Sequence, residues 1–290
     1  MKQQYILENV ESFNPKHIFE CGQCFRWNAQ ADGSYTGVFK NNVLNVKKDN
    51  NKIIFTGECN GNIEDICKDY FDLDNDYEKI KAELSKVDDN LKKGINYGEG
   101  IRILKQDLWE TIISFIISAN NNIPRIKKII ERISESYGDK INWNGSTYFA
   151  FPTPKQLSKA TVEDLRALGL GFRDKRVHDT TELILTKQID LEYLKEIKDS
   201  NILREELNKL PGIGDKVADC IMLFSMKRFD VFPVDVWVRR VMNELYIKNE
   251  DETKVDKNQI RKLAEDKYGN LAGIAQQYLF YWKREEDKTA

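Results

Sequence analysis

The chain has 290 residues, of which 41% are hydrophobic and 32% charged, and its formal net charge at pH 7 is only −2. Such a composition is typical of a globular protein, and the length allows two or three packed lobes. The near-zero charge excludes attraction of a polyanion by overall charge, so such a partner must meet a local basic face. No apolar run reaches membrane-spanning length, and the N-terminus lacks an apolar signal core. We therefore expect no membrane partner and a cytoplasmic protein (the cytosol or nucleoid of a bacterium or archaeon, the nucleus of a eukaryote).

Five cysteines are present, an odd number that argues against a disulfide framework. Cys21 and Cys24 form a C-x-x-C pair, which could indicate a metal or redox site. The chain has no second pair at ligand spacing and only two histidines. We therefore predict two packed thiols and no metal ligands.

The first hundred residues predict a sheet. Short segments rich in β-branched residues, partly alternating with polar ones, cover 33–39, 42–48 and 52–58. Asn41-Asn42 and Asn50-Asn51 lie between them and suit tight turns, because asparagine tolerates positive φ. A helix is expected over 63–73.

From about residue 99 the apolar spacing becomes helical. The nearly all-apolar segment 107–119 predicts a buried helix, and Pro124 suits the first turn of the next one. Thr161 and Asp164 have the spacing of a capping box. Further helices are expected over 203–210, 258–269 and 271–283. The predicted fold is therefore α+β: an N-terminal antiparallel sheet lobe (1–98), then an all-helical region of two lobes with a cleft between them (99–290).

The segment "LNKLPGIGDKVAD", residues 207–219, predicts two helices joined by a sharp turn. Gly212 and Gly214 let the backbone approach a ligand without a Cβ clash, and the next helix should start near Asp215. Free N–H groups at a helix start favour phosphate. A weaker copy of this helix–Gly-x-Gly–helix pattern occurs at 165–177. On this pattern alone, two ordinary glycine-capped helix ends are the favoured interpretation of both segments.

Lys216 lies in the first turn of that predicted helix. The positive end of the helix dipole should favour its neutral form, which is a nucleophile, although a solvated surface lysine fits the position equally well. Cys220 shares a helix face with Lys216. Asp235 precedes another helix, where it can act as an N-cap, as a carboxylate that stabilises positive charge near Lys216, or as both.

These residues bring out a family resemblance. "LPGIGDKVADC" and "FPVDV" resemble the helix-hairpin-helix plus Gly/Pro-Asp signature of the base-excision DNA glycosylases, in the 8-oxoguanine glycosylase/lyase branch of the eukaryotic type. "GQCFRW", "GIRILKQDLWETIISFIISANNNIPRI", "LGLGFRDKRV" and "AQQYLF" resemble the same family in order and spacing. The resemblance covers nearly the whole chain. It implies a monomeric DNA-repair enzyme that excises 8-oxoguanine from duplex DNA and then nicks the strand, with no required cofactor.

The resemblance also implies roles for individual residues. Lys216 matches the nucleophile that attacks C1′ and forms a Schiff base, and Asp235 matches the catalytic aspartate. Four residues match the base pocket: Gly22, whose carbonyl would accept the N7–H of the oxidised base, Cys220, Gln276 and Phe280. Seven residues match DNA contacts, namely Asn120, Arg125, Phe172, Arg173, Gly212, Gly214 and Trp237. Among these, Asn120 would fill the gap left by the flipped base, and Arg125 and Arg173 would contact the orphaned cytosine.

Two residues depart from the eukaryotic pattern. Phe172 replaces a tyrosine wedge, and Trp237 replaces a histidine near a phosphate. The hairpin carbonyls of this superfamily often hold a monovalent or divalent cation with DNA, which we expect here. Alternatives left open are a branch acting on adenine, alkylated purines or thymine glycol, and a non-catalytic hairpin module in which Lys216 only contacts phosphate. The absence of cluster cysteines and the presence of Lys216 argue against the first. The second leaves Asp235, Gly22 and Gln276 without a role.

Overall fold

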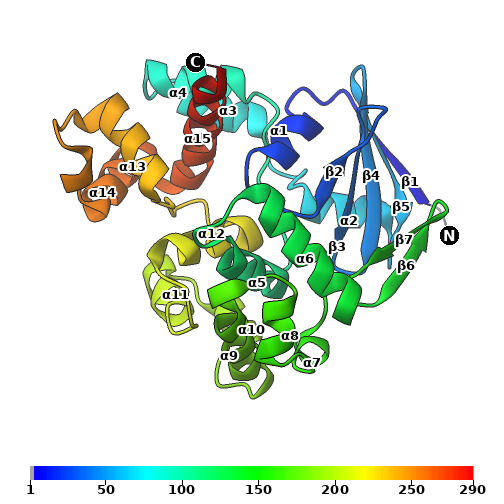
Figure 1. The fold of residues 1–290 in the computed structure, drawn as a ribbon. Coiled ribbons are helices and arrows are strands. Elements are labelled where there is room, and N and C mark those ends of the chain that lie inside the picture. Colours follow the sequence, from blue (N-terminus) through cyan, green and yellow to red (C-terminus); the bar gives the residue numbers. More distant parts are fainter. Residues whose placement is uncertain (1–2, 290) are drawn as a thin grey trace.

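The computed structural model describes residues 3–289 and has the predicted α+β architecture. Figure 1 shows a sheet at one side of the molecule and helices over the rest. The antiparallel sheet has the strand order β1-β5-β4-β3-β2. Its strands are β1 (Gln3–Glu8), β2 (Trp27–Ala29), β3 (Tyr35–Phe39), β4 (Asn42–Asp49) and β5 (Lys52–Glu58). Within the described residues, no helix has the length and apolar character needed to cross a membrane.

The turns between these strands follow the prediction at one place and depart from it at another. Asn50 has a φ of 51°, as expected for the turn between β4 and β5. Between β3 and β4 the positive φ, 52°, falls on Lys40 rather than on Asn41 or Asn42. Asn42 is instead the first residue of β4, and its Oδ1 accepts the N–H of Asn60 at 2.8 Å. The expectation of an Asn-Asn turn there is wrong because Asn42 pairs with Phe39 in the ladder.

An aromatic core lies beneath the sheet. Phe13, Phe55 and Phe71 are fully buried, and the Trp27 indole stacks on Phe19 with ring centroids 4.0 Å apart. The Trp27 N–H donates to the Tyr70 hydroxyl at 3.0 Å, so the polar atom of this large side chain is satisfied. Two helices flank this core: α1 (Pro15–Glu20) and α2 (Ile63–Tyr70).

The helices form a second, larger core. The predicted buried helix is α5 (Leu108–Ser118), where nine of eleven residues are buried. Thr161 and Asp164 form both bonds of the capping box at the start of α8. The remaining helices are α3 (Tyr77–Leu84), α4 (Asp89–Tyr97), α6 (Ile123–Tyr137), α7 (Pro154–Leu157), α8 (Val162–Ala167), α9 (Asp174–Leu185), α10 (Leu191–Glu196), α11 (Ser200–Leu207), α12 (Asp215–Met226), α13 (Val236–Met242), α14 (Lys257–Tyr268) and α15 (Ala272–Thr289).

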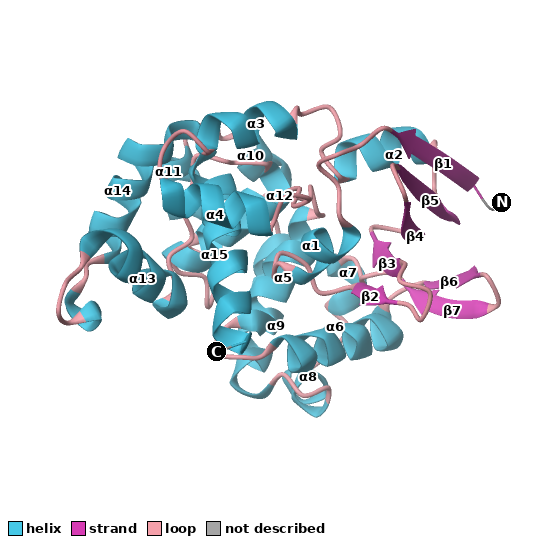
Figure 2. Ribbon diagram, turned by 90° about the horizontal axis from the view of Figure 1, so that it is seen from above, coloured by secondary structure: helices cyan, strands magenta, loops and turns pink. Residues whose placement is uncertain are grey.

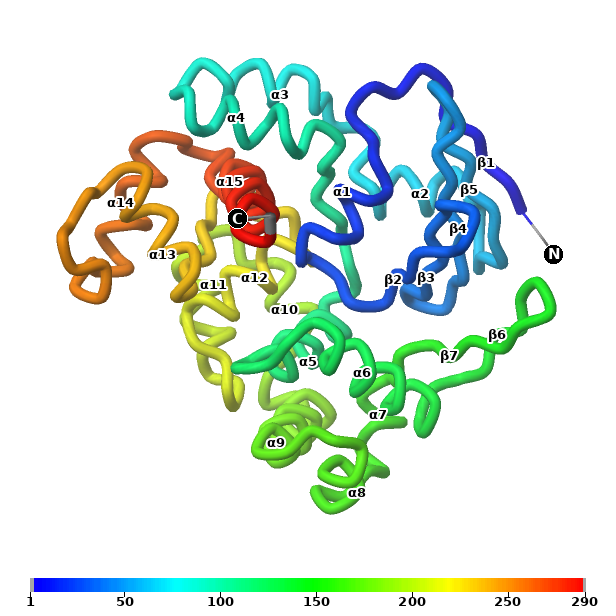
Figure 3. Tube along the Cα trace, turned by 45° about the horizontal axis from the view of Figure 1, so that its top comes forward, coloured from blue at the N-terminus to red at the C-terminus, as the bar shows by residue number. Residues whose placement is uncertain are grey.

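Two features that were not predicted affect how the sheet and the helices are arranged. A separate two-stranded hairpin, β6 (Lys140–Trp143) and β7 (Ser146–Phe149), follows α6 and projects toward the sheet, as the view from above shows (Figure 2). In addition, α4 lies against α15 at the other end of the chain (Figure 3). A Cβ on Gly94 of α4 would stand 3.1 Å from the Tyr278 carbonyl oxygen of α15, so the glycine allows this close approach. The division at residue 98 stays a prediction.

The extended segment 101–107 joins the sheet to the helices. The buried Arg102 guanidinium donates to the carbonyl oxygens of Ser12, Phe71, Asp72 and Asn75. Four backbone acceptors from two segments, the loop before α1 and the loop between α2 and α3, are thereby held by one side chain. This clamp fixes the loops that lead to the candidate site.

Candidate active site

The turn between α11 and α12 has the predicted hairpin geometry. Gly212 has a φ of +85°, a conformation that favours glycine. Gly214 is the N-cap of α12, and no side chain caps this helix. Leu210 is buried beneath the turn. The start of α12 therefore presents backbone N–H groups, and Lys216 stands in its first turn.

Lys216 extends into a small pocket between α5, α12, α13 and α15. Its lining includes Gly22, Cys220, Asp235, Gln276 and Phe280, and the cavity volume is about 50 Å³. The structure thus brings together the predicted catalytic pair and the four predicted base-pocket residues from four separate parts of the chain. A space of this size holds about one water molecule, so the pocket must open to admit a purine.

The electrostatics of Lys216 differ from the prediction of a neutral amine. Its pKa is raised above the ordinary value by Cys220 and also by Asp235, while burial acts in the opposite direction. Burial raises the pKa of the Cys220 thiol itself to about 11. The expectation of a lowered lysine pKa is therefore wrong for the free pocket, because the neighbouring groups outweigh burial. The amine also lies 5.6 Å from the centroid of the Phe115 ring, a cation–π distance that favours the charged form.

Asp235 is the N-cap of α13. One carboxylate oxygen accepts the Val238 N–H at 2.7 Å. This bond restrains the carboxylate while the side chain lines the pocket with Lys216. Both sequence interpretations of Asp235, the cap and the charge near the lysine, coexist in the structure.

Gly22 stands in a loop that a buried glutamine holds in place. The Gln23 side chain donates to the Ile18 and Arg102 carbonyl oxygens at 2.9 and 2.8 Å and accepts the Leu104 N–H at 2.9 Å. Gly22 itself has a φ of +92°. The sequence analysis did not identify Gln23 as the anchor of this loop. Two of its partners, Arg102 and Leu104, lie 79 and 81 residues away, and no local pattern indicates them.

Two residues of α15 form one wall of the pocket. Gln276 is buried, and its side-chain oxygen accepts a hydrogen bond from the Gln277 amide at 2.7 Å. The Arg284 guanidinium lies 5.3 Å from the centroid of the Phe280 ring. Arg284 was missed, although its i,i+4 spacing from Phe280 could have indicated it. Its side chain also donates to the Glu20 carbonyl oxygen, which links α15 to the loop before Gly22.

Trp237 is placed behind this wall. Its ring packs edge-on against Phe280 with centroids 5.9 Å apart and an interplanar angle of 66°. The predicted contact of its indole with a phosphate remains a prediction. In the structure the Trp237 ring packs against Phe280, the pocket residue that was expected to stack on the base.

The predicted opposite-strand residues gather around the loops after α5 and α8. Phe172 is 56% exposed, as a wedge requires. Arg173 is buried, and its guanidinium donates to the Ala119 and Asn120 carbonyl oxygens at 2.8 and 2.7 Å. Asn120 has a φ of 50°. Arg125 donates to the Gly169 carbonyl oxygen at 3.3 Å. Arg173 donates to backbone carbonyl oxygens through all three side-chain nitrogens, whereas Arg125 makes one such bond with a described residue and keeps other N–H donors for a base.

Comparisons with known proteins agree with this arrangement. Residues 5–112 match the family model of the 8-oxoguanine DNA glycosylase N-terminal domain, and residues 113–266 match that of the HhH-GPD superfamily base excision DNA repair proteins. The chain is 33% identical over 230 residues to a probable N-glycosylase/DNA lyase of Methanothermobacter thermautotrophicus, covering 72% of this chain and 71% of the relative.

Solved structures show the same likeness over almost the whole chain. The apo 8-oxoguanine glycosylase/lyase of Clostridium acetobutylicum is 45% identical with a TM-score of 0.91, covering 97% of this chain and 98% of that one. Its complex with double-stranded DNA containing cytosine opposite 8-oxoguanine gives 44% identity and a TM-score of 0.92, with 99% and 98% covered. The chain belongs to the HhH-GPD superfamily of base excision DNA repair proteins.

Proposed function

We propose that this chain is a bifunctional DNA glycosylase and abasic-site lyase that removes 8-oxoguanine from duplex DNA. The observation that supports this most is the shared pocket. Lys216 at a helix start, Asp235 at a helix N-cap and the Gly22 loop line it together with Gln276 and Phe280. A non-catalytic hairpin module needs none of these beyond the lysine. The relatives named above, a glycosylase/lyase and a probable N-glycosylase/DNA lyase, support the same reaction.

The Lys216 amine acts as the nucleophile. Neutral Nζ bonds to C1′ of the flipped nucleotide while the glycosidic bond breaks, and the electron pair leaves with the base, which takes up a proton. Opening of the sugar ring gives a Schiff base. Loss of a C2′ proton then breaks the C3′–O bond and cuts the strand on the 3′ side. Asp235 stabilises the positive charge that develops on the sugar.

The other pocket residues select and hold the base. The Gly22 carbonyl accepts the N7–H of 8-oxoguanine, a proton that guanine lacks, and an unmatched buried acceptor costs about 1–3 kcal/mol. Gln276 reads the Watson–Crick edge, Phe280 stacks on the ring, and Cys220 forms the opposite wall. In the free pocket Gln276 accepts from the Gln277 side-chain amide, a bond that orients the Gln276 side chain.

The remaining contacts hold the flipped state. Flipping costs a few kcal/mol, so the stack must be refilled and the partner base held. Asn120 and Phe172 fill the stack, and Arg125 and Arg173 contact the orphaned cytosine. The backbone at Gly212 and Gly214 binds phosphate. Trp237 adds a contact near the same strand.

No cofactor enters these steps. Among residues 3–289, no group of three or more His, Cys, Asp or Glu side chains is placed to hold a metal ion. A cation at the hairpin carbonyls with DNA bound would therefore rest on carbonyl oxygens, and excision should persist in EDTA. We expect the enzyme to act as a monomer in the cytoplasm.

Borohydride trapping on duplexes with 8-oxoguanine opposite each of the four bases tests this function. The wild-type chain should give a covalent adduct and Lys216→Gln none, while Lys187→Gln, at an exposed lysine outside the pocket, should trap normally. An adduct with Lys216→Gln would assign the chemistry to another amine. Trapping on abasic DNA without excision of 8-oxoguanine would make the substrate class wrong.

A further inference from the structure

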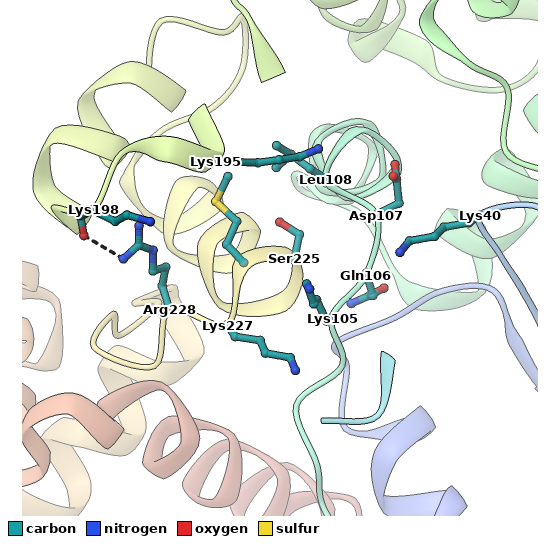
Figure 4. Close-up of a pocket in the computed structure, with 11 residues that line it drawn as sticks. Lys40, Lys105, Gln106, Asp107, Leu108, Lys195, Lys198, Ser225, Lys227 and Arg228 are labelled. Atoms are coloured by element: carbon teal, nitrogen blue, oxygen red, sulfur yellow. Dashed lines mark hydrogen bonds between the residues drawn. The ribbon is translucent and has the colours of Figure 1, made fainter. Parts of the chain in front are cut away.

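A second cavity, of about 600 Å³, lies at the end of α12 opposite to Lys216. Helix α12 has 12 residues and is therefore about 18 Å long. Figure 4 shows side chains from several separate segments around this space. Six of the lining residues are cationic: Lys40, Lys105, Lys195, Lys198, Lys227 and Arg228. This is a concentration of positive charge in a chain whose net charge is −2.

Part of this charge has no acidic partner. Lys105, Lys195 and Lys227 pair with acids that do not line the cavity. Arg228 donates only to neutral carbonyl oxygens, those of Ile197 and Lys198. Lys40 and Lys198 are exposed and make no ion pair with any described residue. Three cationic groups from separate segments are thus available to an incoming anion.

One acidic side chain, Asp107, also lines the cavity. Its Oδ1 accepts the Glu110 N–H at 2.9 Å and caps α5. The hydrogen bond from Glu110 occupies one carboxylate oxygen of Asp107. The other oxygen would repel an anion only at the edge of the cavity where Asp107 lies. The cationic groups therefore outnumber the acidic ones even when the paired lysines are left out.

A wall separates this cavity from the Lys216 pocket. The Gln106 N–H donates to the Phe224 carbonyl oxygen at 2.9 Å, and its side-chain amide donates to the Gln23 carbonyl oxygen at 2.7 Å. Gln106 lines the basic cavity, whereas Phe224 lines the pocket that holds Lys216. The hairpin glycines, Asn120 and Phe172 do not line the basic cavity. It is a separate site from the proposed DNA face.

The geometry points to a binding site for a compact oligophosphate, such as pyrophosphate or the triphosphate group of a nucleotide. Lysines bind phosphate as point charges that need no fixed orientation, and several of them around one space suit a multiply charged anion. The volume lies within the range of small-molecule sites. A duplex backbone would need a continuous exposed strip of cations, whereas these surround one hollow bordered by the strand turn at Lys40, α10 and the end of α12.

Titration calorimetry tests this site by measuring the affinity for inorganic pyrophosphate and for ATP, each in magnesium-free buffer. The double charge reversal K40E/K198E should weaken binding of both at least tenfold and leave excision unchanged, because neither lysine belongs to the proposed catalytic site. K155E/K159E makes the same change of charge at two exposed lysines outside the cavity and should bind as the wild type does. Equal affinity for both ligands would identify the phosphates as the recognised group, and tighter binding of ATP would add a base contact; either supports the site.

Binding should also survive when the protein is saturated with a duplex that carries an uncleavable abasic analogue. Competition between duplex and pyrophosphate, together with normal binding by K40E/K198E, would place the anion on the DNA face and overturn the proposal. A loss of duplex affinity in K40E/K198E would assign the cavity to the path of DNA instead. Absence of pyrophosphate and ATP binding to the wild-type chain would also overturn it. None of these results depends on which base the enzyme removes.

Discussion

At the scale of single residues, the charge state of Lys216 is the central question. The free pocket raises the pKa of this amine, yet attack on C1′ requires the neutral form. The neutral fraction grows as the pH rises toward that pKa, so single-turnover excision should become faster across neutral and mildly alkaline pH. Entry of the base must also rearrange the small cavity, which changes the surroundings of the amine.

Asp235→Asn separates the effect of this carboxylate on the pKa of Lys216 from its effect on the rate of excision. Removing its charge takes away one cause of the raised lysine pKa, so the pH profile of excision should move to lower pH. The maximal rate should nevertheless fall by about 100-fold or more, since the developing positive charge loses its partner. Asparagine is also a good N-cap, so the melting temperature should change little. An unshifted profile with an unchanged maximal rate would remove Asp235 from the chemistry.

At the scale of elements, the loop that carries Gly22 is positioned by its conformation and by α15. A Cβ at Gly22 would stand 3.2 Å from an Arg284 nitrogen and 3.4 Å from the Phe280 ring, at a φ of +92°. A side chain at this position would be strained by the positive φ, and the Arg284 guanidinium would have to shift slightly to make room for a Cβ.

Gly22→Ala should strongly lower the rate of 8-oxoguanine excision but only modestly lower the free energy of unfolding. The positive φ alone costs about 1–2 kcal/mol for a residue with a Cβ. Gly33→Ala is a matched control, because Gly33 has a φ of +80° and open space around its Cβ position. Both variants should lose similar stability in urea unfolding, but only Gly22→Ala should lose excision. Equal activity of the two would contradict a role for this loop in the pocket.

Three helices of the hairpin region meet at a buried carboxylate. Asp219 of α12 accepts from Arg204 of α11 at 2.7 Å and lies 3.4 Å from Arg261 of α14. Burial raises the pKa of Asp219 to about 6, so it is mostly ionised at pH 7. This ion pair holds the catalytic helix against its two neighbours.

Asp219→Ala should destabilise the protein by about 3–5 kcal/mol, because it leaves the largely buried Arg204 without its carboxylate partner and Arg261 with only the more exposed Asp215. The control is Asp266→Ala, which breaks the exposed pair with Lys262 and should cost at most about 1 kcal/mol. Urea unfolding at pH 7 measures both. A loss of less than about 1 kcal/mol for Asp219→Ala would mean that the helices are held by apolar packing alone.

At the scale of the whole molecule, the near-neutral chain must bind DNA through local contacts. Phosphate binding releases counterions, so the logarithm of duplex affinity should fall linearly with the logarithm of salt concentration, by about 0.9 per phosphate contact. Fluorescence anisotropy between 50 and 200 mM KCl measures this slope. A flat response would contradict binding through the hairpin N–H groups and the arginines of the opposite-strand cluster.

Much of the architecture followed from local sequence patterns. Alternation indicated β3, β4 and β5, apolar spacing indicated α5, and residues 161–164 indicated a capping box that the structure contains. These features depend on neighbours a few residues apart, and local sequence therefore predicts them. The hairpin β6–β7 was missed, because its strands have only four residues each and none of these residues is buried.

The sequence by itself determined the hairpin at Gly212, the lysine at the start of α12, the capping aspartate and, through the family resemblance, the set of pocket residues. Only the tertiary structure decided how these groups face one another: the raised pKa of Lys216, the Gln23 anchor, the inward Arg173 and the basic cavity at the far end of α12. The physical reason is that most of the charge, burial and hydrogen bonding in these places arises between residues far apart in the sequence, although the nearby Cys220 also acts on Lys216. Such contacts exist only once the lobes have packed.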